Sequence, residues 1–156
     1  ALEERLDELQ GQPYLLGYWF QHSVDRILKR FGKRVTFFGG GDMAEEKRIE
    51  DAWNAGDIEF LVGHPQAIGR GLNLQRSSQN VGFFDLIWDY ELYDQFIRRV
   101  MRQGNHHAYV YIDHYIALDT VDEVLWRVSA LEGSKAKGQQ RLFDALMALR
   151  REKAQK

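Results

Sequence analysis

The most constraining feature of the sequence is an alternation between short apolar segments and longer segments with helical periodicity. The apolar segments lie at residues 14–20, 34–38, 58–62, 81–86 and 108–112. Strands that are apolar on both sides, with amphipathic helices between them, are typical of parallel sheets buried between two helical layers. The sequence therefore predicts an α/β fold with a mainly parallel sheet flanked by helices.

The connecting helices are predicted from apolar stripes and from capping residues. After the first strand, Val24 and Ile27 fall on one face of a helix whose other face is basic. After the second strand, Asp42 is the expected cap of a helix, with Glu45 at the capping-box position and a stop at Gly56. Both helices fit the layered fold.

We expect three parts along the chain. Residues 1–13 form a charged leading helix or linker, residues 14–131 form the α/β domain, and residues 132–156 form a C-terminal helix with a basic tail. With 156 residues and 44% hydrophobic composition, the chain is large enough to bury a core.

Composition limits the kinds of site that the chain can carry. The 21 basic and 23 acidic residues give a net charge of −2, so a nucleic-acid site must come from local charge. The absence of cysteine excludes disulfides and thiolate metal sites. No apolar run reaches the length of a membrane span, so we expect no membrane partner.

Residues 93–105 form the most distinctive basic segment. Read as a helix, this segment buries apolar side chains such as Phe96 and Val100 on one face and is expected to stop at Gly104. The opposite face carries Gln95, Arg98, Arg99 and Arg102. Three guanidiniums and an amide suit a polyanion, and a solvated basic face is the alternative interpretation.

A glycine-rich segment, residues 63–75, is a second candidate for ligand binding. Gly69 and Gly71 would let a ligand approach the backbone, and Asn73 can both donate and accept hydrogen bonds. In parallel sheets ligands bind at the carboxyl ends of the strands, where we expect this segment together with residues 21–23. A surface turn is the alternative.

Two histidine and glycine patterns suggest chemistry but are better explained as structure. The glycines at 39–41 are not followed by Gly-Lys-Ser/Thr, and Asp42 would repel a phosphate, so a strand-to-helix turn is expected. His106, His107 and His114 have no carboxylate at a metal-ligand spacing, so surface or loop positions are expected for them.

Two side-chain pairs also suggest chemistry but are better explained as structural residues. Ser23 follows His22, but no Gly-x-Ser-x-Gly turn is present to make the serine a nucleophile. Asp85 and Asp89 follow the fourth strand, where capping and hydrogen bonds to loop backbone are the usual roles of aspartate, with metal binding as the alternative.

The order of these segments resembles the motifs of superfamily-two helicases. Residues 20–27, Phe-Gln-His-Ser-Val-Asp-Arg-Ile, resemble motif IV, and residues 69–75, Gly-Arg-Gly-Leu-Asn-Leu-Gln, resemble motif V of Swi/Snf-type translocases and their phage relatives. Residues 95–104 resemble motif VI, and Thr-Val-Asp-Glu at 120–123 resembles the start of the helix after the last strand. The resemblance runs from about residue 14 to about residue 131. It implies the C-terminal RecA-like lobe, a three-layer sandwich, of an ATP-dependent DNA helicase or translocase of phage or bacterial type.

The resemblance also implies roles for individual residues. Arg102 matches the arginine finger on the γ-phosphate of ATP, and Arg99 matches a second arginine on the same phosphates. The nucleotide cleft would be lined by Gln95, Gly69, Gly71 and Asn73. Contacts to DNA or RNA would come from His22, Ser23 and His64, and the local charge of Arg26 would add a salt-dependent contact. Arg98, where the motif has glycine, has no implied role.

The chain contains neither a Gly-Lys-Ser/Thr loop nor an Asp-Glu-x-His sequence. The resemblance assigns these parts to an N-terminal RecA-like lobe, the expected partner, which would hold most of the ATP and its Mg²⁺. We therefore expect the 156-residue chain to be inactive alone, and expect its protein in the cytoplasm of a bacterial or phage-infected cell.

Two other functions stay open at this point. The chain could be a non-catalytic, flavodoxin-like interaction module whose arginine face binds an acidic partner protein. It could also be a stand-alone nucleotide- or phosphate-binding protein, against which the missing phosphate loop argues.

Overall fold

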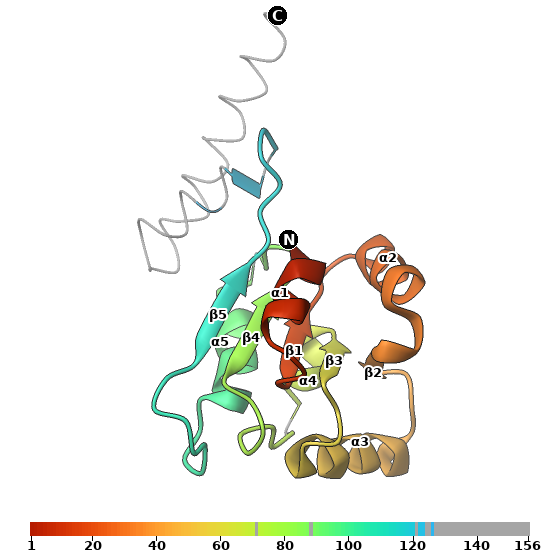
Figure 1. Cartoon of the computed structure of the whole chain (residues 1–156), viewed down its shortest axis with the longest axis vertical. Helices are drawn as coiled ribbons and strands as arrows, with labels where there is room; N and C mark the ends of the chain where they lie inside the picture. Colours follow the sequence, from red (N-terminus) through yellow and green to blue (C-terminus); the bar gives the residue numbers. More distant parts are fainter. Residues whose placement is uncertain (71, 88, 121, 124–125, 127–156) are drawn as a thin grey trace, which may run out of the picture. The chain divides into compact units, whose positions relative to one another are not determined.

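The computed structural model describes residues 1–70, 72–87, 89–120, 122–123 and 126 (Figure 1). The chain divides into two compact units, residues 1–115 and 116–156, and the helices and strands described below belong to the first. The predicted C-terminal helix and tail at 132–156 lie outside the described residues. The three-part division of the chain stays a prediction.

A five-stranded parallel sheet forms the centre of the first unit, with the strand order β2-β3-β1-β4-β5. The strands are β1 (Tyr14–Gly17), β2 (Thr36–Phe38), β3 (Phe60–Gly63), β4 (Asn80–Phe83) and β5 (Tyr111–His114). Tyr14 lies beside Phe60 on one side and Asn80 on the other, so β1 is the central strand. The predicted α/β class and parallel sheet are confirmed.

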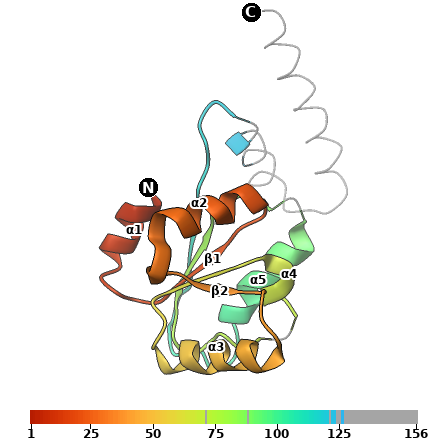
Figure 2. The same ribbon diagram turned by 90° about the vertical axis from the view of Figure 1, so that its right-hand side faces the viewer.

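Helices cover both faces of this sheet. Helices α1 (Leu2–Glu8) and α2 (Gln21–Phe31) lie on one side of the strands, followed by a short 3-10 helix at Gly32–Arg34. Helices α3 (Met43–Ala55), α4 (Pro65–Ile68) and α5 (Tyr90–Val100) pack on the other side, as Figure 2 shows for α4 and α5. Each face therefore has a hydrophobic core of its own.

The predicted leading helix forms and packs on the sheet. Leu2, Leu6 and Leu9 are buried in the same cluster as Tyr14 of β1. The Arg5 Nε donates to Asp113 Oδ2 on β5 at 2.7 Å, and the Tyr14 hydroxyl donates to the same oxygen at 3.0 Å. This polar contact connects α1 to the edge strand of the sheet.

The ends of α3 agree with the sequence. Asp42 Oδ1 accepts the backbone N–H of Glu45 at 2.9 Å, as a capping residue does. Gly56 has φ +84°, the left-handed conformation that ends many helices and that glycine adopts without strain. The strand-to-helix turn expected at residues 39–41 is also present, between β2 and α3.

The predicted helix over residues 93–105 is wrong at its carboxyl end. Helix α5 begins at Tyr90, with Asp89 accepting two backbone N–H groups as its cap, and it ends at Val100. Asn105 Nδ2 donates to Val100 O at 3.0 Å and to Ser78 O at 3.2 Å, which ties the following turn to the residues before β4. Arg102 therefore lies in a turn beyond the helix.

Candidate functional site

The arginine segment and the glycine-rich segment meet on the helical face that carries α4 and α5. Arg99 Nη2 donates to Gly69 O at 2.6 Å, and Arg102 Nη1 donates to Asn73 Oδ1 at 2.6 Å. The partners are 30 and 29 positions apart along the chain. The fold therefore brings together four of the residues predicted for one site.

Both guanidiniums keep donors for a further acceptor. A guanidinium has five N–H donors, of which each arginine uses one in the contacts above. The Arg99 Nε is buried without a hydrogen-bond partner among the described residues. Neither arginine forms an ion pair in the described part of the chain. Two positive charges without a carboxylate partner suit an anionic ligand.

Gln95 belongs to the same group. An added Cβ on Gly69 would lie 2.9 Å from Pro65 O and 3.3 Å from Gln95 Oε1, so glycine is needed for this close approach. Gln95 Nε2 donates to Glu91 Oε1 at 3.4 Å. Gln95, Gly69 and Arg99 are thus neighbours, as predicted, whereas Gly71 lies outside the described residues.

Helix α3 holds the glycine-rich segment through contacts that the sequence did not indicate. Asn54 Nδ2 donates to Asn73 O at 2.6 Å, and Glu50 Oε2 accepts the N–H of Asn73 at 3.3 Å. Asn54 Oδ1 accepts the N–H of Arg76 at 3.3 Å. We call these residues, with Arg102, the Asn73 network. A helix face with polar residues at positions 50 and 54 beside Trp53 was the available signal.

The Asn73 network lies away from the carboxyl ends of the strands. Asn73 is bonded to Asn54 in the last turn of α3, which starts after the carboxyl end of β2 and runs back along the sheet, and Ser78 lies just before β4. Helix α5 also runs back from the carboxyl end of β4, so Arg102 follows its far end. The prediction that residues 63–75 lie together at the carboxyl ends is therefore correct for their start and wrong for Asn73.

Aromatic side chains gather at the carboxyl ends of β1 and β3. Trp19 stacks on His64 with ring centroids 5.2 Å apart, and Phe20 stacks on His22 at 5.3 Å. Phe20 is 41% exposed and His22 is exposed. Burial lowers the pKa of His64 below its ordinary value. We call these four residues the aromatic edge.

Ser23 and Asp85 hold the backbone beneath the aromatic edge. Ser23 is buried, and its hydroxyl donates to Asp85 Oδ1 at 2.7 Å. Asp85 Oδ2 accepts the N–H groups of Trp19 and Phe20 at 2.8 and 3.1 Å, the loop role expected for this aspartate. These contacts end β1 earlier than predicted and commit the Ser23 hydroxyl within the domain. Arg26, one turn after His22 on α2, is exposed.

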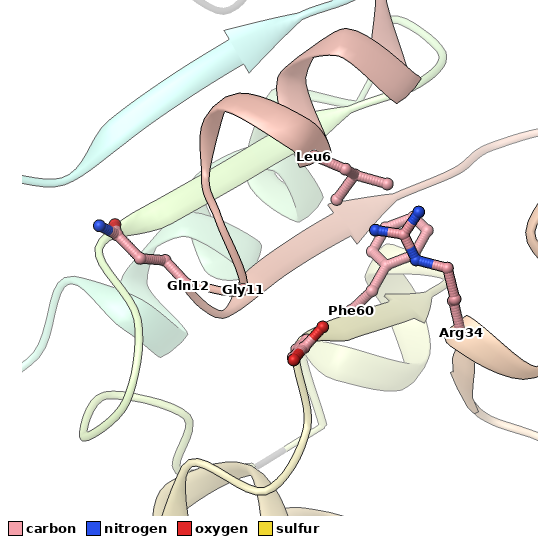
Figure 3. A pocket seen from close by; sticks show the side chains of 6 residues that line it. Leu6, Gly11, Gln12, Arg34 and Phe60 are labelled. Atoms are coloured by element: carbon pink, nitrogen blue, oxygen red, sulfur yellow. The ribbon is translucent and has the colours of Figure 1, made fainter.

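The remaining features are separate from these two regions. A cavity of about 20 Å³ lies near the amino ends of β1 and β3 (Figure 3) and has room for about one water molecule. Its lining consists of Leu6, Gly11, Gln12, Arg34, Glu59 and Phe60. Within the described ranges no three His, Asp or Glu side chains group as a metal site. No described helix is both long and apolar enough to span a bilayer.

Comparison with known sequences identifies similar proteins. The model of the helicase conserved C-terminal domain matches residues 1–104. The putative protein p41 of Acyrthosiphon pisum secondary endosymbiont phage 1 is 38% identical over 129 residues, which cover 80% of this chain and 27% of that protein. The chain thus spans about a quarter of the length of this relative.

Two solved structures have a similar fold. The C-terminal part of the Fun30 ATPase domain aligns with a TM-score of 0.68 and 22% identity, over 79% of this chain and 42% of that one. The Pyrococcus furiosus Hef helicase domain aligns with a TM-score of 0.59 and 20% identity, over 82% of this chain and 26% of that one. The predicted RecA-like arrangement is confirmed.

Proposed function

The chain belongs to the helicase conserved C-terminal domain family, and on this basis we propose that it is the second motor lobe of an ATP-dependent DNA helicase or translocase. In this proposal an N-terminal RecA-like lobe of the same protein holds most of the ATP and its Mg²⁺. This chain, as the second lobe, supplies Arg102, Arg99 and part of the nucleic-acid track. The observation that carries the proposal is the pairing of both arginines with the glycine-rich segment.

The two arginines suit phosphoryl transfer to water. Such a reaction is catalysed by positioning and by stabilising negative charge, and an arginine supplied by a second domain contributes about 10³–10⁵ in rate. Arg102 is exposed, and its contact with Asn73 occupies one donor and leaves the others for phosphate oxygens. Arg99 uses one terminal N–H group on Gly69 O, which leaves its other terminal N–H groups for a phosphate oxygen.

The aromatic edge and Arg26 supply the nucleic-acid contacts in this proposal. Exposed rings can stack on bases, while a nearby guanidinium can neutralise a backbone phosphate. Phe20, His22 and Arg26 are exposed within two turns of chain, and His64 lies beside Trp19. Ser23 is left out because its hydroxyl is already bonded to Asp85.

Residues 64–78 connect the two regions and suggest how ATP use is coupled to movement. His64 belongs to the aromatic edge, and Asn73 contacts Arg102. ATP would draw the partner lobe over Arg99 and Arg102, and hydrolysis would release it. If ATP binding and hydrolysis displace this segment, the contact between His64 and the nucleic acid changes. Repeated cycles would move the lobe along the nucleic-acid strand.

Replacement of Arg102 tests the proposal in the intact protein that carries this lobe. Arg102→Ala should lower DNA-stimulated ATP hydrolysis by about 10³-fold or more, because the transferred phosphoryl group loses a positive charge. DNA affinity should change by no more than about twofold, since Arg102 lies away from the aromatic edge. Steady-state turnover and DNA titration measure the two quantities.

Arg98→Ala is the matched control. Arg98 lies in the last turn of α5, shortly before Arg102, is exposed, and its Nε donates to Asp94 Oδ2 at 2.7 Å. An exposed pair of this kind contributes little to stability, so turnover should stay near that of the unmodified protein. Turnover of Arg102→Ala equal to that of Arg98→Ala would contradict the proposed function.

A further inference from the structure

Asn54, in the last turn of α3, lies outside every helicase motif and still contacts the candidate site. Its side-chain amide bonds in both directions, donating to Asn73 O at 2.6 Å and accepting from the N–H of Arg76 at 3.3 Å. The amide therefore serves as a substitute for a neighbouring strand along this irregular backbone.

Two neighbours on α3 complete this support. Glu50 Oε2 accepts the N–H of Asn73, so both backbone polar groups of Asn73 are bonded to α3. Trp53, which is fully buried, donates from Nε1 to Leu74 O at 3.0 Å. The Glu50 side chain is only 13% exposed, which strengthens its hydrogen bond. Helix α3 thus fixes the backbone at Asn73 and Leu74.

Fixing the backbone of Asn73 sets the position of its Cβ, from which the side-chain amide reaches Arg102. Asn73 Oδ1 then accepts from Arg102 Nη1 at 2.6 Å. Arg102 itself lies in a turn beyond α5, and among the described hydrogen bonds its guanidinium bonds to Asn73 Oδ1. The described contacts to the Arg102 guanidinium therefore depend on Asn73, and the position of Asn73 depends on α3.

We propose that Asn54 is a positioning residue for Arg102, acting through Asn73. The inference rests on the proposed function, because Arg102 must reach ATP for its position to affect turnover. Without the Asn54 amide, Asn73 is free to shift, and Arg102 loses its orientation while keeping its charge. Misplacement of a catalytic group by about 1 Å costs about 10²-fold in rate, and a loosened group costs less.

The test uses the intact protein and two substitutions of Asn54. Asn54→Ala removes both hydrogen bonds, and Asn54→Asp keeps the acceptor for Arg76 N–H but loses the donor to Asn73 O. Each should lower kcat for DNA-stimulated ATP hydrolysis by about tenfold, with KM for ATP and DNA affinity within about twofold, because the interaction matters in the transition state.

Arg48→Ala is the control on the same helix. Arg48 is exposed and its Nη2 donates to Glu45 Oε1 at 2.7 Å, with no contact to the glycine-rich segment among the described hydrogen bonds. Its kcat should match that of the unmodified protein. Thermal unfolding of all variants shows whether they are folded at the assay temperature. If Asn54→Ala is unfolded at that temperature, the test uses Asn54→Asp.

A double-mutant cycle with Asn73→Ala tests the route of the effect. If Asn54 acts through Asn73, then Asn54→Ala should lower kcat by less than about twofold in the Asn73→Ala background, because the shared interaction is already lost. Independent, multiplying effects would overturn the inference, as would an unchanged kcat of both Asn54 variants. Loss of turnover in Arg102→Ala alongside normal Asn54 variants would leave the proposed function standing, whereas normal turnover in Arg102→Ala would refute that function itself.

Discussion

The Asn73 network and the aromatic edge use their side chains in different ways. In the Asn73 network, three parts of the chain far apart in sequence meet through hydrogen bonds of 2.6 to 3.3 Å. In the aromatic edge, three of the four rings come from residues 19–22, and Phe20 and His22 remain exposed. The first region depends on exact distances between polar atoms, and the second presents surface for contact.

This contrast predicts two kinds of response to substitution. Changes in the network should alter catalytic rate steeply, since hydrogen bonds and charge stabilisation require correct geometry. Changes in the aromatic edge should alter affinity by smaller and more additive amounts, since stacking tolerates displacement. The predictions below test that division, together with the substitutions of Arg102 and Asn54 given above.

After the loss predicted for Arg102→Ala, the next largest effect is expected at Arg99. Arg99→Ala should lower DNA-stimulated turnover by about 10²-fold or more through the lost charge, and should destabilise the lobe by about 1–3 kcal/mol because Gly69 O loses its partner. Turnover assays and chemical denaturation measure these separately. If the folded Arg99→Ala variant turns over ATP as fast as the unmodified protein, Arg99 has only a structural role. That result would contradict the expected difference between the two regions.

A smaller effect is expected at Phe20. Phe20→Ala should weaken binding of single-stranded DNA by about tenfold, since stacking of a base on an aromatic ring contributes about 1–3 kcal/mol. Turnover at saturating DNA should not change. Leu28→Ala is the matched control, because Leu28 is an apolar residue of α2 that is 38% exposed, against 41% for Phe20. Equal losses of affinity in the two variants would show that stacking is not involved.

The smallest effect concerns pH. Burial lowers the pKa of His64 in the aromatic edge and of His114 on β5. The negative charge of Asp113 raises the pKa of His114 and offsets part of that lowering. Between each lowered pKa and the ordinary value of about 6.5, the unfolded chain binds more protons than the folded one, so stability falls as the pH drops through that window. The stability that these two neutral histidines contribute is fully present above about pH 6.5.

Denaturation midpoints at pH 7.5 and 5.5 measure this loss. His114→Phe should flatten the dependence more than His64→Gln, because the His114 ring is held among Phe83 and Tyr93 whereas His64 stacks at the edge of the domain. An identical slope in the unmodified chain and in both variants would assign the pH dependence to other groups.

Much of the fold could be predicted from the sequence because its signals are local. The alternation of apolar and amphipathic segments gave the five strands, and Asp42 and Gly56 gave the ends of α3. The ends of the other elements were less predictable. Trp19 and Phe20 continue the apolar run of β1 but leave the sheet, because Asp85, distant in sequence, accepts their backbone N–H groups.

The candidate site was predicted in part for the same reason. Gly69, Gln95, Arg99 and Arg102 are of residue types that follow from the chemistry, and their motifs have recognisable spacings. Asn54 and Glu50 were missed, because a polar residue on a helix looks the same in sequence whether it meets solvent or a backbone carbonyl. Ser23 was predicted to contact nucleic acid, because a serine whose hydroxyl is bonded within the domain looks the same in sequence as one that faces a ligand.

The sequence by itself determined the class of the fold, the family and the residue types at the site, because periodicity, capping and motif spacing are properties of short segments. Only the tertiary structure decided that Arg102 leaves the helix, that Asn54 reaches Asn73, and that Ser23 points to Asp85. Those outcomes depend on how α3, α5 and the segment between them pack. Packing is set by the whole core and cannot be read from the few residues that make each contact.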